Sequence, residues 1–408
     1  MVPEDKRYAP DSSYAWLRLA MALVVGTVAC AGTWSVVVVL PAVQAEFGTL
    51  RAGASLPYTC VMLGFGAGNI VMGRVADRYG MMVPVLIAGV GAGLGFVLAG
   101  MSSNLWQFAL AHGLLIGFCA GAGFGPIIAD LSHWFRRHRG LAVVLGASGS
   151  YLAGMLWPQV VTWGLAHYDW RVTHIGIGIV TAAVLIPLSL FFRRQPAAGH
   201  LAVDEAAASS ARGDLGLTPR QIQLLLAVAG FCCCIAMSMP QVHIVAYCGD
   251  LGYGVARGAE MLSLMLGLGI ISRVLSGVIS DRIGGAPTLA LGALMQGVAL
   301  FLYLFFDGLT SLYIVSGIFG LFQGGIVPMY AVIIREYLPA REAGVRIGIV
   351  MSSTLLGMAA GGYVSGLIYD LSNSYRLAFL NGLAWNLLNL AIVCWLMMKA
   401  RPRAAVAA

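Results

Sequence analysis

Long apolar runs of helix length, separated by short polar intervals, follow one another along the whole chain. Each run spans roughly 20 residues, which at a rise of about 1.5 Å per residue matches a hydrocarbon core about 30 Å thick. The alternation of polar and apolar positions that is typical of a membrane β-barrel is absent. The pattern predicts an all-α membrane protein with twelve transmembrane helices, at residues 16–43, 54–76, 82–101, 104–129, 138–163, 170–192, 220–247, 256–278, 286–306, 310–333, 341–367 and 374–399.

The composition supports this prediction. The chain of 408 residues is 59% hydrophobic and 10% charged, with a mean hydropathy of +0.85. A soluble core of this size would need far more polar surface to cover it. We therefore expect a multi-pass protein of the plasma or inner membrane, surrounded by lipid.

The positions of the cations predict the orientation of the chain, because cytoplasmic loops of membrane proteins retain Lys and Arg. With the N-terminus inside, the cytoplasmic segments hold every Lys and Arg except Arg51, Arg171, Arg257 and Arg376 on the outer side, and Arg273 within a span. This distribution places both termini in the cytoplasm. It also accounts for the net charge of +7, so a nucleic-acid partner is not expected.

A polar interval rich in Ala and Ser divides the apolar runs into two groups of six. Such an interval is typical of a linker. We predict an N-terminal cytoplasmic segment 1–15, a six-helix bundle 16–192, a cytoplasmic linker 193–219, a second six-helix bundle 220–399 and a cytoplasmic tail 400–408.

The two groups repeat each other at nearly equal offsets. The repeated features are "GRVADRYG" at 73–80 and "GVISDRIG" at 277–284, a Gly or Val before Pro126 and Pro328, and an aromatic residue with Arg at Trp170-Arg171 and Tyr375-Arg376. Coincident offsets in chain order predict two pseudo-repeats. Many secondary transporters are built from such halves, with the substrate near the membrane midplane.

The repeated loop carries a family resemblance. Its pattern GxxxDRxG resembles the signature of the major facilitator superfamily, although Met81-Met82 and Gly285-Ala286 replace the usual second basic pair. The resemblance implies the major facilitator fold and transport by alternating access. The glycines are expected to permit close helix contact and a tight turn, and the Asp and Arg to pair and to meet helix ends. The loop residues are Gly73, Asp77, Arg78 and Gly80, with Gly277, Asp281, Arg282 and Gly284.

A second resemblance concerns "HWFRRHRGLAVVLGASGS", residues 133–150, which is similar to a pattern of the monocarboxylate transporters. That family and the related oxalate and formate exchangers place an arginine in the eighth helix, and Arg273 matches it. Animal monocarboxylate transporters also carry an Asp one turn earlier, where Gly269 stands here, and a Lys in the first helix, which this chain lacks. Their proton-coupling residues therefore do not transfer. The second deep cation of oxalate exchange is absent from 347–362.

The position of Arg273 points to a carboxylate ligand without that resemblance. It lies eight residues before Asp281, about 12 Å into the hydrocarbon core. A charge at the centre of a membrane helix costs about 3 kcal/mol on insertion scales, so it should face a polar cavity or a partner. Guanidinium grips a carboxylate with two parallel hydrogen bonds. We expect Arg273 to bind a carboxylate; the alternative is a structural arginine that reaches the membrane interface.

Other polar residues within the spans are weaker candidates. Asn69, Gln323, Tyr330 and Tyr151 are candidate substrate-binding residues, and helix-to-helix hydrogen bonding or packing is the alternative for each. Histidine titrates near physiological pH. His243 and His112 are therefore candidates, with Arg273, for carrying a coupling proton, and a structural histidine is the alternative.

These features together predict a secondary active transporter of a small monocarboxylate, similar to lactate or pyruvate, that moves with a proton in symport. The alternatives are a carboxylate anion exchanger of the oxalate or formate type, proton-driven drug efflux and a receptor that does not transport.

An enzyme is not expected. The glycine-rich stretches at 89–95 and 121–125 lie in apolar runs without βαβ context, and no metal motif is present. We expect no cofactor, no metal and no obligate protein partner.

Overall fold

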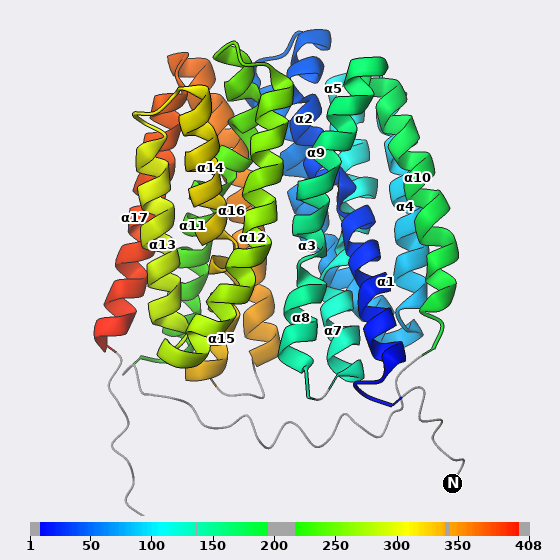
Figure 1. Cartoon of the computed structure of the whole chain (residues 1–408), viewed down its shortest axis with the longest axis vertical. Coiled ribbons are helices and arrows are strands. Elements are labelled where there is room, and N and C mark those ends of the chain that lie inside the picture. Colours follow the sequence, from blue (N-terminus) through cyan, green and yellow to red (C-terminus); the bar gives the residue numbers. More distant parts are fainter. Residues whose placement is uncertain (1–8, 136, 195–216, 339–342, 400–408) are drawn as a thin grey trace, which may run out of the picture. The chain divides into compact units, whose positions relative to one another are not determined.

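The computed structural model describes residues 9–135, 137–194, 217–338 and 343–399, and nearly all of them are helical (Figure 1). The first half contains α1 (Ser13–Ala29), α2 (Ala31–Glu46), α3 (Arg51–Tyr79), α4 (Met82–Gly100), α5 (Leu105–Leu110), a π-helical turn (Ala111–Gly117), α6 (Phe118–Ala120), a 3-10 turn (Gly121–Gly123), α7 (Gly125–Trp134), α8 (Arg139–Ala147), α9 (Gly149–His167) and α10 (Trp170–Phe191). The second half contains α11 (Pro219–Asp250), α12 (Val255–Ile283), α13 (Gly285–Leu302), α14 (Leu309–Gln323), α15 (Ile326–Tyr337), α16 (Ala343–Ser372) and α17 (Tyr375–Lys399).

Within the described ranges these helices form twelve segments long and apolar enough to cross a membrane, as predicted. Most of the observed segments extend a few residues past the predicted runs at one or both ends, since helices continue into the polar interface, whereas Met82–Gly100, Trp170–Phe191 and Gly285–Leu302 end before the predicted runs do. The segments are Ser13–Glu46, Arg51–Tyr79, Met82–Gly100, Leu105–Trp134, Leu141–His167, Trp170–Phe191, Pro219–Asp250, Val255–Ile283, Gly285–Leu302, Leu309–Tyr337, Val345–Ser372 and Tyr375–Lys399.

Several helices begin at residues that satisfy their first backbone N–H groups. The side chains of Ser12, Asn104 and Asp169 each accept a hydrogen bond from the backbone N–H three residues later. Such caps stabilise a helix start by about 1 kcal/mol. The cap at Asn104 explains why the third and fourth spans are separate despite the short interval between them.

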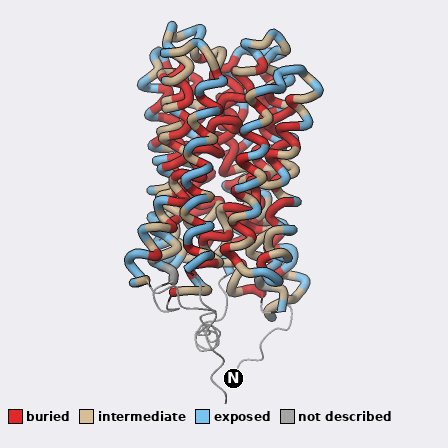
Figure 2. Tube along the Cα trace, turned by 90° about the vertical axis from the view of Figure 1, so that its left-hand side faces the viewer, coloured by how far each residue is buried: buried red, intermediate tan, exposed pale blue. Residues whose placement is uncertain are grey.

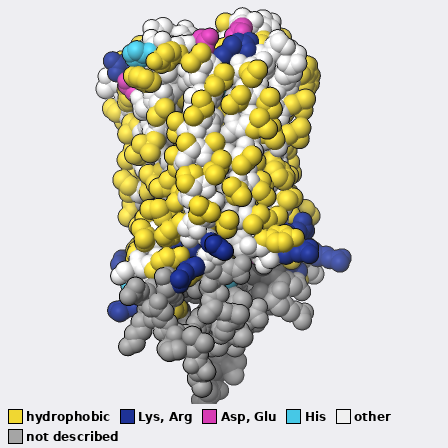
Figure 3. Space-filling view, turned by 90° about the vertical axis from the view of Figure 1, so that its right-hand side faces the viewer, with side chains coloured by type: hydrophobic (Ala, Val, Ile, Leu, Met, Phe, Trp, Pro, Cys, Tyr) yellow, Lys and Arg dark blue, Asp and Glu magenta, His cyan; other side chains and the backbone are white. Residues whose placement is uncertain are grey.

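The surface is that of a membrane protein. Figure 3 shows a belt of apolar side chains with Lys and Arg at its edges. Large apolar residues such as Leu94, Ile179 and Ile314 are more than half exposed. Buried and exposed residues alternate along the helices in Figure 2, as expected of helices with one face on protein and one on lipid. The chain is therefore a multi-pass membrane protein. Its location in the plasma or inner membrane and the cytoplasmic placement of its termini remain predictions.

By its contacts the chain divides into two compact units. Unit 1 comprises Met1–His200 and Val242–Gly267, and unit 2 comprises Leu201–Gln241 and Leu268–Ala408. Both α11 and α12 therefore contribute to each unit. The predicted bundle boundaries at 16–192 and 220–399 stay a prediction.

Parts of the predicted cytoplasmic segments fall outside the described residues. These are residues 1–8 of the N-terminal segment, residues 195–216 of the linker and the whole tail 400–408.

Within unit 1, polar contacts join Val242–Gly267 to earlier helices. An Nη atom of Arg51, at the start of α3, donates to both carboxylate oxygens of Asp250 at 3.0 Å. The side-chain amide of Gln159 in α9 donates to the hydroxyl of Ser263 at 3.1 Å. These contacts explain why this segment groups with unit 1.

A buried ion pair joins α1 to α7 in unit 1. Arg18 donates from Nε and from an Nη atom to the two carboxylate oxygens of Asp130, at 2.7 and 2.8 Å. The guanidinium also lies 4.8 Å from the ring centroid of Trp134 and 4.9 Å from that of Phe192. The Arg18 side chain is 1% exposed and that of Asp130 is 10% exposed. Each buried charge is therefore stabilised by the opposite charge of the other residue.

We predict that Asp130→Ala lowers the free energy of unfolding by about 3–5 kcal/mol, because it leaves the buried Arg18 charge without its counter-ion. Chemical unfolding of the purified protein in detergent measures this change. The matched control is Glu260→Ala, which breaks the solvent-exposed Arg257–Glu260 pair and is expected to change stability little. Equal small effects of the two substitutions would contradict the prediction.

Candidate functional site

Arg273 lies in α12 of unit 2 and is buried, with 7% of its surface exposed. Its Nε donates a hydrogen bond of 3.2 Å to the backbone carbonyl of Gly324, between α14 and α15. The next residue also contacts α12, because the N–H of Gly325 donates to the hydroxyl of Ser272 at 3.1 Å. The carbonyl is neutral, so its contact with Arg273 leaves the positive charge in place.

The chain approaches Gly324 very closely at this point. A Cβ added to Gly324 would lie 2.1 Å from the carbonyl oxygen of Gly269 in α12. Only glycine allows the two backbones to come this near. The glycine at position 269, where animal monocarboxylate transporters carry Asp, is thus part of the contact that holds Arg273 against α14.

Two buried glutamines adjoin this contact. Gln323 is the last residue of α14 and precedes Gly324 directly, and its Oε1 accepts a short hydrogen bond from Nε2 of Gln241 in α11. Both side chains are almost completely buried. The Nε2 of Gln323 has no hydrogen-bond partner within the described part of the chain. A buried donor that makes no hydrogen bond is costly.

Tyr330, the third candidate in unit 2, bonds to a residue of α17. It is fully buried, and its hydroxyl donates to Oδ1 of Asn389 in α17 at 2.8 Å. The structure therefore brings Arg273 and Gln323 together around Gly324, whereas the Tyr330 hydroxyl bonds to a different helix.

The candidates Asn69, Tyr151, His112 and His243 belong to unit 1. Asn69 in α3 is half-buried, and its Oδ1 accepts from the backbone N–H of Gly125 at 2.9 Å. Tyr151 in α9 and His243 in α11 are both buried.

His112 is fully buried in the π-helical turn. Its Nδ1 bonds to the carbonyl of Phe108 at 2.9 Å, and its ring centroid lies 5.5 Å from that of His174 in α10. His174 is equally buried and bonds through Nδ1 to the carbonyl of Trp170. Among the described residues, neither Nε2 atom has a partner. The two histidines form one buried cluster in unit 1.

The repeated loop is built on its last glycines. Gly80 and Gly284 have φ of 79° and 91°, which confirms the expected tight turn. The expected close helix contact at Gly73 and Gly277 is not found, because a Cβ at either position would meet no atom within 4 Å.

The charged residues of the loop are solvent-exposed: Asp77, Arg78, Asp281 and Arg282. None of the four belongs to an ion pair formed among described residues. The carboxylate that meets a helix end here is that of Glu336, which accepts from the N–H of Gly285 at the start of α13.

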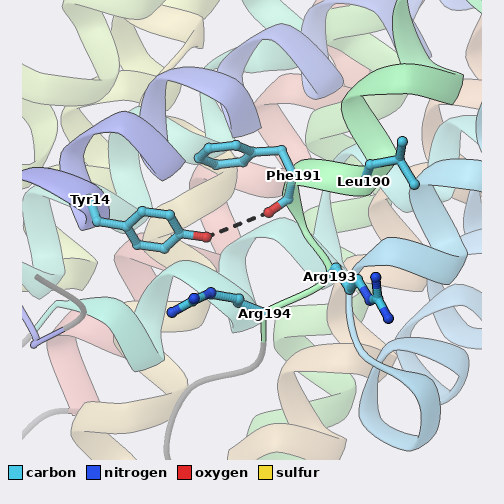
Figure 4. A pocket seen from close by; sticks show the side chains of 5 residues that line it. All are labelled: Tyr14, Leu190, Phe191, Arg193 and Arg194. Carbon is cyan, nitrogen blue, oxygen red and sulfur yellow. Dashed lines mark hydrogen bonds between the residues drawn. The ribbon is translucent and has the colours of Figure 1, made fainter. Parts of the chain in front are cut away.

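Unit 1 contains a cavity of about 570 Å³ (Figure 4). It is lined by Tyr14, Leu190, Phe191, Arg193 and Arg194, where α10 ends. The hydroxyl of Tyr14 donates to the carbonyl of Phe191 at 3.5 Å. None of the predicted site residues lines this cavity.

Sequence reasoning missed Gln241, Ser272 and His174. Each was visible as a polar residue in an apolar run, and Ser272 directly precedes Arg273. Gln241 and Ser272 bond to residues outside their own helices, and the His174 ring lies near that of His112 on another helix, so the run alone did not single them out. No cluster of three or more His, Cys, Asp or Glu that could hold a metal ion occurs in the part of the chain that was described.

Comparisons with known proteins agree with this architecture. The family model of the Major Facilitator Superfamily matches residues 22–315 and 275–408. The MFS-type transporter pynF of Aspergillus niger is 26% identical over 77% of this chain and 71% of its own. Monocarboxylate transporter 13 of Bos taurus is 28% identical over 76% of this chain and 72% of its own. Among solved structures, the nucleoside transporter NupG superposes with a TM-score of 0.74 at 13% identity, covering 93% of this chain and 99% of that one.

We predict that Gly324→Ala strongly destabilises the protein, because the added methyl group would collide with the backbone of α12 at Gly269. The melting temperature in detergent measures the effect. Gly348→Ala is the control, because a Cβ at Gly348 in α16 meets no atom within 4 Å. A melting temperature of Gly324→Ala equal to that of the control would contradict the close approach.

Proposed function

Because this chain belongs to the Major Facilitator Superfamily, and is thus a membrane transporter, we propose that it carries a small monocarboxylate such as lactate by secondary active transport. The transported anion binds at Arg273 and moves with a proton in symport. The two pseudo-repeats alternate the access to this site from the two sides of the membrane.

One observation carries the proposal: a permanent cation and an unmade amide donor lie at the same buried junction. Arg273 bonds to the carbonyl of Gly324, and the Nε2 of the neighbouring Gln323 has no partner among the described residues. Both groups donate hydrogen bonds, and a carboxylate is the small ligand that accepts several at once. The similarity to monocarboxylate transporter 13 supports the same substrate class.

The charge of the site favours a single carboxylate. One guanidinium carries a single positive charge, which the single charge of a monocarboxylate matches. A dicarboxylate would bring a second negative charge. The buried glutamines Gln323, which directly precedes Gly324 in the chain, and Gln241, which bonds to Gln323, are neutral and offer that second charge no counter-ion.

The proton is proposed to enter together with the anion beside Arg273, since an anion and a proton move without net charge. His112 and His243 stay candidates for a separate proton site. Both are fully buried in unit 1.

We predict that labelled lactate enters proteoliposomes when an inward proton gradient is imposed, and that Arg273→Ala lowers the initial rate at least about 30-fold. Removing one partner of a buried charge pair costs about 2–5 kcal/mol of binding free energy. Arg273→Lys is expected to retain part of the activity, because lysine keeps the charge and loses the two-pronged donor.

Arg257→Ala is the matched control, because it removes an exposed arginine from the same helix. Equal uptake by Arg273→Ala and the native protein would overturn the role of Arg273. Uptake that requires an anion preloaded in the vesicles, whatever the proton gradient, would point to exchange. Proton-driven export of an uncharged drug, without lactate uptake, would point to efflux.

We also predict that Gln323→Leu raises the KM for lactate by about tenfold to 100-fold, because hydrogen bonds to charged groups contribute about 1.5–3 kcal/mol. The maximal rate should change less. Gln296→Leu is the control, because Gln296 is an equally buried glutamine of unit 2 that bonds to the carbonyl of Cys233. The same KM for the native protein and Gln323→Leu would remove Gln323 from the site.

A further inference from the structure

Each unit contains a membrane span that is interrupted near a proline. In unit 1, the span Leu105–Trp134 leaves helical geometry at Phe124, two residues before Pro126. In unit 2, α14 ends at Gln323 and α15 begins at Ile326, two residues before Pro328. The two prolines occupy matching places in the repeat.

The proline determines which backbone carbonyl is left without a helical hydrogen-bond donor. A proline has no N–H, so the carbonyl four residues earlier loses its helical donor. For Pro328 that carbonyl belongs to Gly324, which is the one that accepts from Nε of Arg273. The arginine thus supplies the hydrogen bond that the proline removes.

The matching junction in unit 1 is capped without a charge. There Asn69, at the position of the repeat that corresponds to Arg273, accepts from the N–H of Gly125. Close backbone contact accompanies the cap in both units: a Cβ on Gly121 would lie 2.3 Å from the backbone of Gly68, much as Gly324 approaches Gly269. Both units thus set a polar side chain against the interrupted backbone, but in unit 1 an amide oxygen accepts from an N–H, whereas in unit 2 a guanidinium donates to a carbonyl.

This difference has a chemical consequence. Asn69 is neutral, and the atom that bonds to the Gly125 N–H is an acceptor, so a carboxylate cannot take that atom as a donor. Arg273, in contrast, uses Nε for the carbonyl of Gly324, and a carboxylate that binds side-on to a guanidinium takes Nε and one Nη. Such an anion would replace the Gly324 carbonyl at Nε.

We propose that the α14–α15 junction responds to the bound anion: the carboxylate takes Nε of Arg273, the Gly324 carbonyl loses its donor, and the start of α15 loosens. Ser272, which holds the N–H of Gly325, is a positioning residue of this junction. The inference rests on the proposed function, because it assigns to the carboxylate at Arg273 the role of a trigger. The junction at Gly125 does not respond.

Hydrogen–deuterium exchange of the peptide spanning 322–331, in lipid nanodiscs, tests the proposal. In the native protein, saturating lactate should make exchange in this peptide about tenfold faster. In Pro328→Ala, alanine restores an N–H for the Gly324 carbonyl, so lactate should bind without changing the exchange. Pro126→Ala is the matched control at the equivalent place in unit 1, and it should keep the full response to lactate.

A solute-free comparison separates this proposal from the proposed function. Without lactate, Ser272→Ala should raise exchange in 322–331, whereas Ser280→Ala should not, because the Ser280 hydroxyl bonds within α12 to the carbonyl of Gly277. Unchanged exchange in Ser272→Ala overturns the junction, as does lactate binding to the native protein without faster exchange or a full response in Pro328→Ala. Failure of lactate to bind the native protein, with Ser272→Ala behaving as expected, counts against the proposed substrate alone.

Discussion

Within a membrane, every backbone N–H and carbonyl must find its hydrogen bond inside the protein, because the hydrocarbon offers none. Pro328 breaks this condition in the tenth span by removing the helical donor to Gly324, and Arg273 restores it. This one hydrogen bond lowers the free-energy cost of a buried carbonyl without a donor. It also lowers the cost of placing a guanidinium in a membrane helix. The interruption of the helix and the buried cation depend on each other.

The same condition shapes unit 1 by different means. There the interruption before Pro126 is held by the neutral amide of Asn69, and the buried charge of Arg18 is balanced by Asp130. Glycines bring the crossing helices close enough for short side chains to reach backbone groups, as at Gly68 and Gly121. The two units thus both bring backbones close together at an interrupted span, and they differ in where their charges lie.

For a transporter of this superfamily, the difference gives the two halves different chemistry. Arg273 donates to a neutral carbonyl, whereas Arg18 donates to a carboxylate. A cation matched by a fixed anion stabilises a fold and has little to offer a ligand. Under the proposed function, the cation of the eighth span binds an anion that arrives from solution, and Gln323 ends α14 directly before Gly324.

The sequence by itself determined the twelve spans and the turns at Gly80 and Gly284, because hydropathy and glycine geometry are local properties. Only the tertiary structure decided which polar groups meet. The pairing of Gln323 with Gln241, the bond from Tyr330 to Asn389 and the missing contact at Gly73 each depend on a neighbouring helix. An apolar run specifies that a helix lies in the membrane and leaves open which face meets which partner, since lipid and protein interior are both apolar.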